Sequence, residues 1–232
     1  MPPRIHSFGS SDLLTHELCA RIAKMAAQCL IEQGYFSIIL AGGETPRELY
    51  RQLRYIATDW RYWHIYFSDE RCLPAGDLQR NDTMATTAWL NYVAIPSAQI
   101  HSVPARSNVN TAAAEYAAIL QHAPGFDLAL LGLGEDGHTA SLFPGGAADD
   151  TSIALAVAVT DAPKLPMRRV SMSPQCLSSS SAVWFIVSGS NKREVLEAWL
   201  GGAPLPPQAI KPHAGVDIFT DLDVESNVTG SQ

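Results

Sequence analysis

The chain lacks features that would assign it to several classes of protein. Its 232 residues contain no run that approaches 18 consecutive apolar residues, so we expect no membrane-spanning helix and no membrane partner. The first twelve residues, MPPRIHSFGSSD, contain no apolar stretch like that of a secretory signal peptide, so we predict a cytoplasmic location. No internal repeat or low-complexity tract is present, and ordinary folding into a globular domain is expected.

Basic residues are also scarce. Lysine and arginine number 16 against 23 aspartates and glutamates, which gives a net charge of −7. Nucleic-acid-binding surfaces usually carry a basic excess, so we expect no nucleic-acid partner. An anionic small molecule is not excluded, because charges close to a ligand dominate at screened distances.

Cysteine is sparse and irregularly spaced. The four cysteines form no CxxC pair, and no histidine lies at zinc-like spacing from them. We therefore expect reduced, mostly buried thiols rather than a disulfide framework, and no metal site. These residues are Cys19, Cys29, Cys72 and Cys176.

What the sequence does contain is an alternation of short apolar runs and amphipathic segments. Such alternation predicts βαβ units, a mostly parallel sheet and an α/β fold. We find no boundary for a second domain and predict one domain over residues 1–232, with a flexible tail at about 223–232. Helices are predicted at residues 11–33, from Pro46, at 81–90 and at 111–121, and strands within residues 35–40, 63–67, 126–134, 153–159 and 182–188.

Each apolar run is followed by a loop rich in glycine or polar residues. Right-handed crossovers bring the carboxyl ends of parallel strands to one edge, where open α/β sheets bind ligands. The loops that follow the strands should therefore converge on one site.

The first such loop reads AGGETPRE from Ala41. Two glycines allow the backbone to approach a ligand closely, and a helix N-terminus favours an anion such as phosphate. Residues 45–48 fit a capping box, with Pro46 at the first helical position. Taken alone, a well-capped turn without a ligand is equally compatible with this pattern.

The second loop, SDER, ends at Arg71. Its acids suit sugar hydroxyls and its arginine suits a phosphate, although in isolation a solvated surface loop is the commoner outcome. Asn81 opens the next helical stretch and is expected to cap that helix, to reach the site, or both.

The most informative loop is GLGEDGHTASLFP, which contains His138. Histidine exchanges protons near pH 7, and Asp136, two residues earlier, is placed to orient its ring. Six other histidines lack this setting and are interpreted as ordinary core or surface residues.

Two further segments supply cations near the end of the chain. Arg168 and Arg169 begin the predicted strand RRVSMS, and Lys192 follows a strand in GSNK. Either segment can face a phosphate, but surface positions are the more common fate of such residues.

In this order, AGGETP, SDER with Asn81, GLGEDGHTASLFP, RRVSMS and GSNK resemble the motifs of 6-phosphogluconolactonases, from the first helix to about Asp221. The resemblance implies a three-layer α/β/α sandwich with a Rossmann-like sheet, related to sugar-phosphate deaminases and ribose-5-phosphate isomerases. It implies hydrolysis of 6-phospho-D-glucono-1,5-lactone in the oxidative pentose phosphate pathway, without metal or organic cofactor. We expect a monomer or weak homodimer.

The same resemblance assigns roles to individual residues. It implies that His138 is the catalytic acid–base residue and that Asp136 and Asp69 are acids of the site. The implied substrate-binding residues are Gly42, Gly43, Thr45, Arg71, Asn81, Gly137, Arg169 and Lys192.

Two positions depart from the expected pattern. Glu44 stands where serine or threonine is usual, and it should point outward because an acid would repel phosphate. Arg168 adds a cation beside Arg169, and the sequence leaves open which of the two faces the pocket.

Two alternatives to the lactonase were weighed. A related deaminase or isomerase would resemble MDEY and AFNEP where this chain has SDER and ASLFP. A non-catalytic sugar-phosphate sensor would lack the histidine or carry a DNA-binding module, and neither condition holds here.

Overall fold

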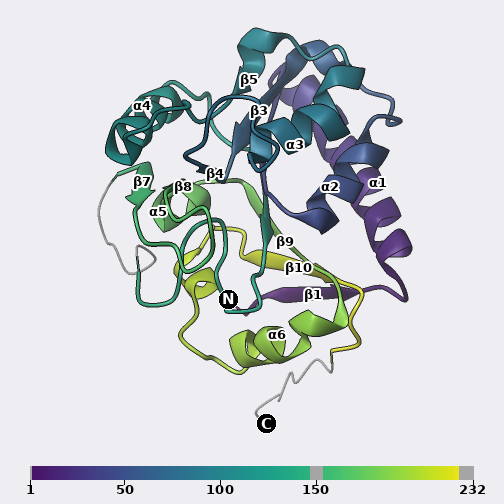
Figure 1. Ribbon diagram of the computed structural model, residues 1–232. Helices are drawn as coiled ribbons and strands as arrows, with labels where there is room; N and C mark the ends of the chain where they lie inside the picture. The colour runs from purple at the N-terminus through teal and green to yellow at the C-terminus, as the bar shows by residue number, and fades with distance from the viewer. Residues whose placement is uncertain (1, 147–153, 225–232) are drawn as a thin grey trace.

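A seven-stranded parallel sheet forms the centre of the molecule (Figure 1). The computed structural model describes residues 2–146 and 154–224. All six strand pairings within this sheet are parallel. In spatial order the strands are β1 (Arg4–Ser7), β10 (Val216–Thr220), β9 (Ala182–Val187), β6 (Leu128–Gly132), β2 (Phe36–Leu40), β3 (Trp63–Phe67) and β5 (Ile100–His101).

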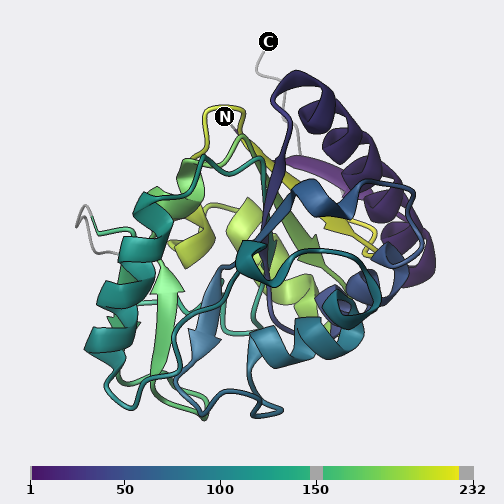
Figure 2. The same ribbon diagram turned by 90° about the horizontal axis from the view of Figure 1, so that it is seen from above.

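Helices cover both faces of the sheet, as the view from above shows (Figure 2). On one side lie α1 (Ser11–Glu32), α2 (Glu44–Leu53) and α3 (Asn81–Ala88). On the other lie α4 (Val109–Gln121), α5 (Pro174–Ser178) and α6 (Arg193–Leu200). The predicted three-layer α/β/α sandwich is therefore confirmed. Short 3₁₀ turns occupy Trp60–Tyr62, Leu90–Tyr92, Ser97–Gln99, Ser190–Lys192 and Pro206–Ala209.

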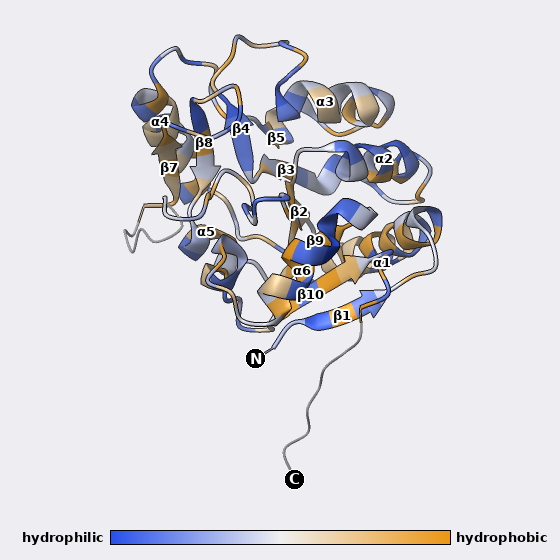
Figure 3. Ribbon diagram, turned by 60° about the horizontal axis from the view of Figure 1, so that its bottom comes forward, coloured by the Kyte–Doolittle hydropathy of each residue, from blue (hydrophilic) through white to orange (hydrophobic). Residues whose placement is uncertain are grey.

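The sheet divides the hydrophobic interior into two cores. Successive side chains of a strand point to opposite faces, so Ile38 packs toward α1 and α2 while Ile39 packs toward α4. Leu130 and Leu131 of β6 divide in the same way. Because both faces are covered, the central strands are largely apolar, which explains the continuous apolar runs and the orange colour of much of β9 and β10 in Figure 3.

A smaller antiparallel sheet lies beside the main one and was not predicted. It consists of β4 (Asp69–Arg71), β8 (Arg169–Met172) and β7 (Ala156–Val159), in that order. In this sheet Arg71 pairs directly with Arg169. The pairing joins SDER to RRVSMS, two motifs that lie about a hundred residues apart in sequence.

Several predicted boundaries shift. The strand expected at residues 153–159 begins at Ala156, and its first predicted residue lies outside the described part of the chain. The helix expected at 81–90 ends at Ala88 and gives way to a 3₁₀ turn. The first helix matches closely, with the Ser10 hydroxyl accepting from the Leu13 N–H. Across the described ranges, no helix has the length and apolar content needed to cross a membrane.

Candidate active site

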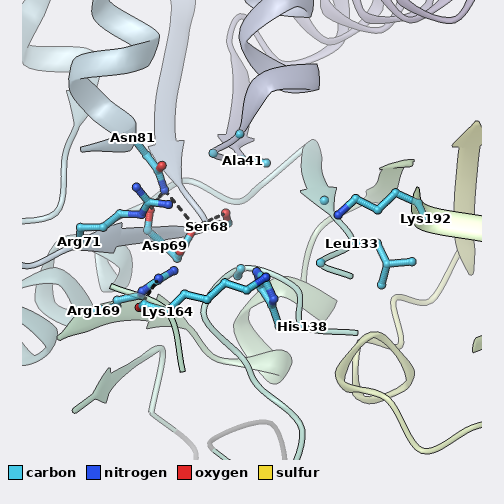
Figure 4. A pocket seen from close by; sticks show the side chains of 15 residues that line it. Ala41, Ser68, Asp69, Arg71, Asn81, Leu133, His138, Lys164, Arg169 and Lys192 are labelled. Carbon is cyan, nitrogen blue, oxygen red and sulfur yellow. Dashed lines mark hydrogen bonds between the residues drawn. The ribbon is translucent and has the colours of Figure 1, made fainter. Parts of the chain in front are cut away.

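The loops that follow β9, β6, β2 and β3 meet at the carboxyl edge of the main sheet and line one pocket (Figure 4). Strand order places Lys192 at one end and Arg71 at the other, with His138 and Gly42 between them. The small sheet closes the side and contributes Arg169. The expected convergence of the strand-end loops is confirmed.

The loop between β2 and α2 differs from the prediction in its cap. Helix α2 begins at Glu44, Gly43 is its N-cap, and no side chain caps it. The predicted capping box is therefore wrong, because Thr45 and Pro46 already lie within the first turn. A glycine cap leaves the first N–H groups of the helix unbound by side chains, which suits an anionic ligand.

Gly42 shows why this loop needs glycine. A Cβ atom at this position would lie 2.1 Å from Oδ1 of Asn81, which is buried and lines the same pocket. Glu44 points outward as expected: its side chain is 72% exposed and pairs with Arg47.

His138 stands on the pocket wall with its ring held on one side. Nδ1 forms a short contact with Asp136 Oδ1, and the ring packs against Phe143 with centroids 4.8 Å apart. Burial raises the pKa of Asp136, but the hydrogen bond and charge of His138, together with nearby Lys164, outweigh it and lower the pKa overall. An ionised Asp136 fixes the proton on Nδ1 and leaves Nε2 as the free ring nitrogen.

Gly134 makes this geometry possible. A Cβ atom there would lie 2.1 Å from His138 Nδ1 and 2.6 Å from Asp136 Oδ1. The Gly134 N–H also donates to the His138 carbonyl at 2.7 Å, which closes the loop on itself. This glycine belongs to the motif because the ring of His138 packs directly over its backbone.

Asp69 faces the pocket from β4 and is only 6% exposed. Its Oδ2 accepts from the Ser141 hydroxyl at 2.6 Å, and its Oδ1 accepts from the Asn81 side-chain amide at 3.1 Å. Asn81 reaches the site but is not an N-cap, since Arg80 holds that position and Asn81 is the first helical residue. The carboxylate is thereby held in one orientation.

Glu70, the other acid of SDER, points away from the pocket. It is fully buried, and its carboxylate accepts backbone N–H groups from Arg71, Asn81 and Asp82 at 2.7–2.8 Å. It therefore caps the start of α3. Burial and the charge of Asp82 raise the pKa of Glu70, despite the neighbouring Arg80 and the bound N–H groups.

The two candidate arginines separate clearly. Arg169 is 4% exposed and lines the pocket, whereas Arg168 is exposed and does not. Burial and the charge of Arg71 lower the pKa of Arg169. Arg71 also lines the pocket and donates through Nη1 to the Gln79 carbonyl at 2.6 Å.

Lysines line the pocket as well. Lys192 was predicted, and burial together with nearby Lys164 lowers its pKa despite Glu135. Lys164 was not predicted, because it lies in a Pro-rich segment that carries no motif recognised from sequence. Its Nζ lies 3.9 Å from Asp136 Oδ2.

The structure thus brings most of the predicted site residues together. Thr45, Gly137 and Asp136 do not line the pocket, and Asp136 acts on it through His138 and Lys164. The sequence analysis did not identify Ser68, Ser141 or Lys164 as site residues. Of these, Ser141 could have been proposed from sequence, because it belongs to the histidine motif, three residues after His138. Within residues 2–146 and 154–224, no three His, Cys, Asp or Glu side chains gather as a metal site.

Several known proteins are similar to this chain in sequence and in fold. The sequence model described as glucosamine-6-phosphate isomerases/6-phosphogluconolactonase matches residues 9–219. A 6-phosphogluconolactonase of Mycobacterium tuberculosis is 35% identical over 217 residues, which cover 88% of each chain. One of Synechocystis is 33% identical and covers 84% of each. The crystal structure of 6-phosphogluconolactonase from Thermotoga maritima superposes with a TM-score of 0.84 at 26% identity, covering 94% of this chain and 98% of that one.

Proposed function

The chain belongs to the glucosamine-6-phosphate isomerase/6-phosphogluconolactonase family, and on that premise we propose that it hydrolyses 6-phospho-D-glucono-1,5-lactone to 6-phospho-D-gluconate, a step of the oxidative pentose phosphate pathway. The observation that carries the proposal is the Asp136–His138 pair on the wall of a cation-lined pocket. The relatives named above support the choice of a lactone as substrate.

His138 is the proposed acid–base residue. With Nδ1 bound to Asp136, Nε2 of the neutral ring takes a proton from a water molecule as its oxygen attacks C1 of the lactone. A tetrahedral oxyanion and an imidazolium result, and Asp136 stabilises the charge on the ring. Such general-base help is worth about 10²–10⁴-fold in rate.

The second step returns the proton. The bond between C1 and the ring oxygen breaks, and the leaving oxygen takes the proton from Nε2 of His138. The ring opens to a carboxylic acid, which ionises and releases one proton to solvent. His138 is neutral again, so the cycle requires no further proton donor from the protein.

The rest of the pocket binds and orients the substrate. We assign the phosphate to the N-terminus of α2 at Gly42 and Gly43, together with Lys192. Asp69, held by Asn81 and Ser141, suits the sugar hydroxyls on the wall that also carries Arg71 and Arg169. Anchoring the phosphate away from C1 turns binding energy into alignment of the carbonyl with the water.

The proposed function is tested by supplying three compounds to the wild-type protein. The first is freshly generated 6-phosphogluconolactone, with spontaneous hydrolysis subtracted. The others are unphosphorylated gluconolactone and glucosamine 6-phosphate, which probes the deaminase alternative. We expect rapid turnover of the phosphorylated lactone, slow turnover of unphosphorylated gluconolactone and none of glucosamine 6-phosphate. Turnover of glucosamine 6-phosphate without lactone hydrolysis would overturn the proposal.

Three sequence-based expectations remain predictions. These are the single domain over residues 1–232, the cytoplasmic location, and a monomer or weak homodimer.

A further inference from the structure

Two lysine ammonium groups converge on the pocket from different elements. Lys192 lies in the 3₁₀ turn that follows β9, and Lys164 lies between β7 and β8. Each side chain points into the pocket in Figure 4, with the Lys164 ammonium beside His138. Burial, followed by the charge of Lys164, lowers the pKa of Lys192 despite Glu135 and Asp136.

No described residue accepts a hydrogen bond from either ammonium. The nearest carboxylate oxygen to Lys164 is Asp136 Oδ2, at 3.9 Å, and Lys192 has no ion pair with any described carboxylate. Asp136 already binds His138 through its other oxygen. Two cations that line one pocket and have unused donors repel one another, and a dianionic group bound in that pocket relieves the repulsion while it accepts their N–H donors.

The backbone around Lys164 is held in place by a buried side chain. Arg169 donates through Nη2 to the Lys164 carbonyl at 2.8 Å and through Nε to the Pro166 carbonyl at 2.9 Å. Arg169 is 4% exposed, and its strand is paired on both sides, with β4 and with β7. The lysine therefore extends into the pocket from a fixed point, although its own side chain is 55% exposed.

We propose that Lys164 is a further substrate-binding residue, that it binds the substrate phosphate together with Lys192, and that Arg169 is a positioning residue for it. The substrate named here rests on the proposed function; the anion-binding role does not. Lys164 accordingly selects for phosphorylated over unphosphorylated lactones, and Arg169 contributes by fixing the loop as well as by its own charge.

The test compares Lys164→Met with Arg168→Met. The second variant removes an exposed cation four residues away that does not line the pocket, so it controls for the change in net charge. Two kinds of measurement are made on each protein. Steady-state kinetics give kcat and KM on both lactones, and calorimetry gives the affinity for inorganic phosphate and for 6-phosphogluconate. Circular dichroism verifies folding.

We expect Lys164→Met to raise KM for the phosphorylated lactone about tenfold and to weaken phosphate affinity similarly, the size usual for a charged hydrogen bond. Values for unphosphorylated gluconolactone, and all values for Arg168→Met, should stay near wild type. Unchanged KM and phosphate affinity in Lys164→Met would overturn the inference. So would a loss confined to kcat, which would mean that Lys164 acts through Asp136 and His138.

The positioning role is tested by Arg169→Gln, alone and with Lys164→Met. We expect their effects on phosphate affinity to be non-additive. Arg169→Gln misplaces the Lys164 side chain, so removing that side chain with Lys164→Met costs less in the double variant. Fully additive losses would overturn that role. If the wild type hydrolyses no lactone while Lys164→Met still loses affinity for inorganic phosphate, the proposed function fails and the role of Lys164 stands.

Discussion

Asp136 and Asp69 both serve the pocket, but their surroundings differ in kind. The loop after β6 carries Asp136 and His138, whose side chains are 33% and 21% exposed. The opposite wall, formed by β4 and the start of α3, carries Asp69 at 6% and Glu70 at 0% exposure. On the first wall a single contact joins the two side chains, whereas on the second each carboxylate accepts several hydrogen bonds.

The difference teaches how to read polar residues that lie close together in one motif. The carboxylate oxygens of Glu70 accept hydrogen bonds from backbone N–H groups, so this residue contributes to the stability of the fold. His138 keeps one ring nitrogen free of described partners and lines the pocket. We therefore expect changes in the β6 loop and at Asp69, which faces the pocket, to alter turnover, and changes at Glu70 to alter stability.

Among the variants that keep His138, the largest effect is expected from Gly134→Ala. The added methyl group would lie 2.1 Å from His138 Nδ1, so the ring must move. A displacement of about 1 Å at a catalytic group can cost about 10²-fold in rate. Gly132→Ala is the matched control for folding, because its Cβ meets nothing within 4 Å. Steady-state turnover measures the catalytic loss, and thermal unfolding measures stability, in both glycine variants. A Gly134→Ala enzyme as fast as the wild type would contradict the position described for the His138 ring.

Asp136→Asn should follow, with a loss of about 10–100-fold in turnover, the usual range for a residue that orients another. The amide no longer fixes the proton on Nδ1 or stabilises the imidazolium. KM for the phosphorylated lactone should change far less than kcat. Equal losses in both would point instead to a binding role.

The same residue predicts a pH effect on stability. The pKa of Asp136 is lower in the folded protein than in the unfolded chain. Its contribution is therefore present above the unfolded pKa, near 4, and is lost as the pH falls through the folded value. Urea unfolding from pH 6 down to pH 3 should show a steeper loss of stability in the wild type than in Asp136→Asn.

On the other wall, Glu70→Gln should lower the free energy of unfolding by about 1–3 kcal/mol, because at least one buried N–H loses its acceptor. Turnover per folded molecule should stay close to wild type. Asp69→Asn, at the neighbouring residue, should lower turnover per folded molecule and leave the free energy of unfolding close to that of the wild type. Urea titration and turnover normalised to folded protein separate the two results, and a turnover loss in Glu70→Gln without loss of stability would contradict the division.

The smallest effect is expected at Glu44. Its carboxylate is exposed and paired with Arg47, so Glu44→Ser should change KM by less than about twofold. A tenfold fall in KM would mean that the acid reaches the phosphate and opposes its binding.

Much of this site could be predicted from the sequence because its loops directly follow strands of the main sheet. Apolar runs located β2, β3, β6 and β9, and parallel topology then required their loops to meet. The pairing of β4 with β8 was not accessible, because three- and four-residue strands carry almost no periodic signal. Without that pairing, neither the choice between Arg168 and Arg169 nor the place of Lys164 could be derived.

The roles within SDER show a second limit. Sequence presents Asp69 and Glu70 as equivalent neighbours, but alternation along β4 sends one toward the pocket and the other toward α3. The predicted capping box was wrong for a related reason. The pattern at Thr45 fits a cap, but it does not show that the helix already begins at Glu44, with Gly43 as its N-cap.

The most direct test of the central claim is turnover of freshly generated 6-phosphogluconolactone by His138→Ala beside the wild type. The account predicts a loss of about 10²–10⁴-fold with unfolding unchanged and 6-phosphogluconate still bound. Turnover retained in a folded His138→Ala protein would contradict the account and would transfer the proton chemistry to the opposite wall, at Asp69.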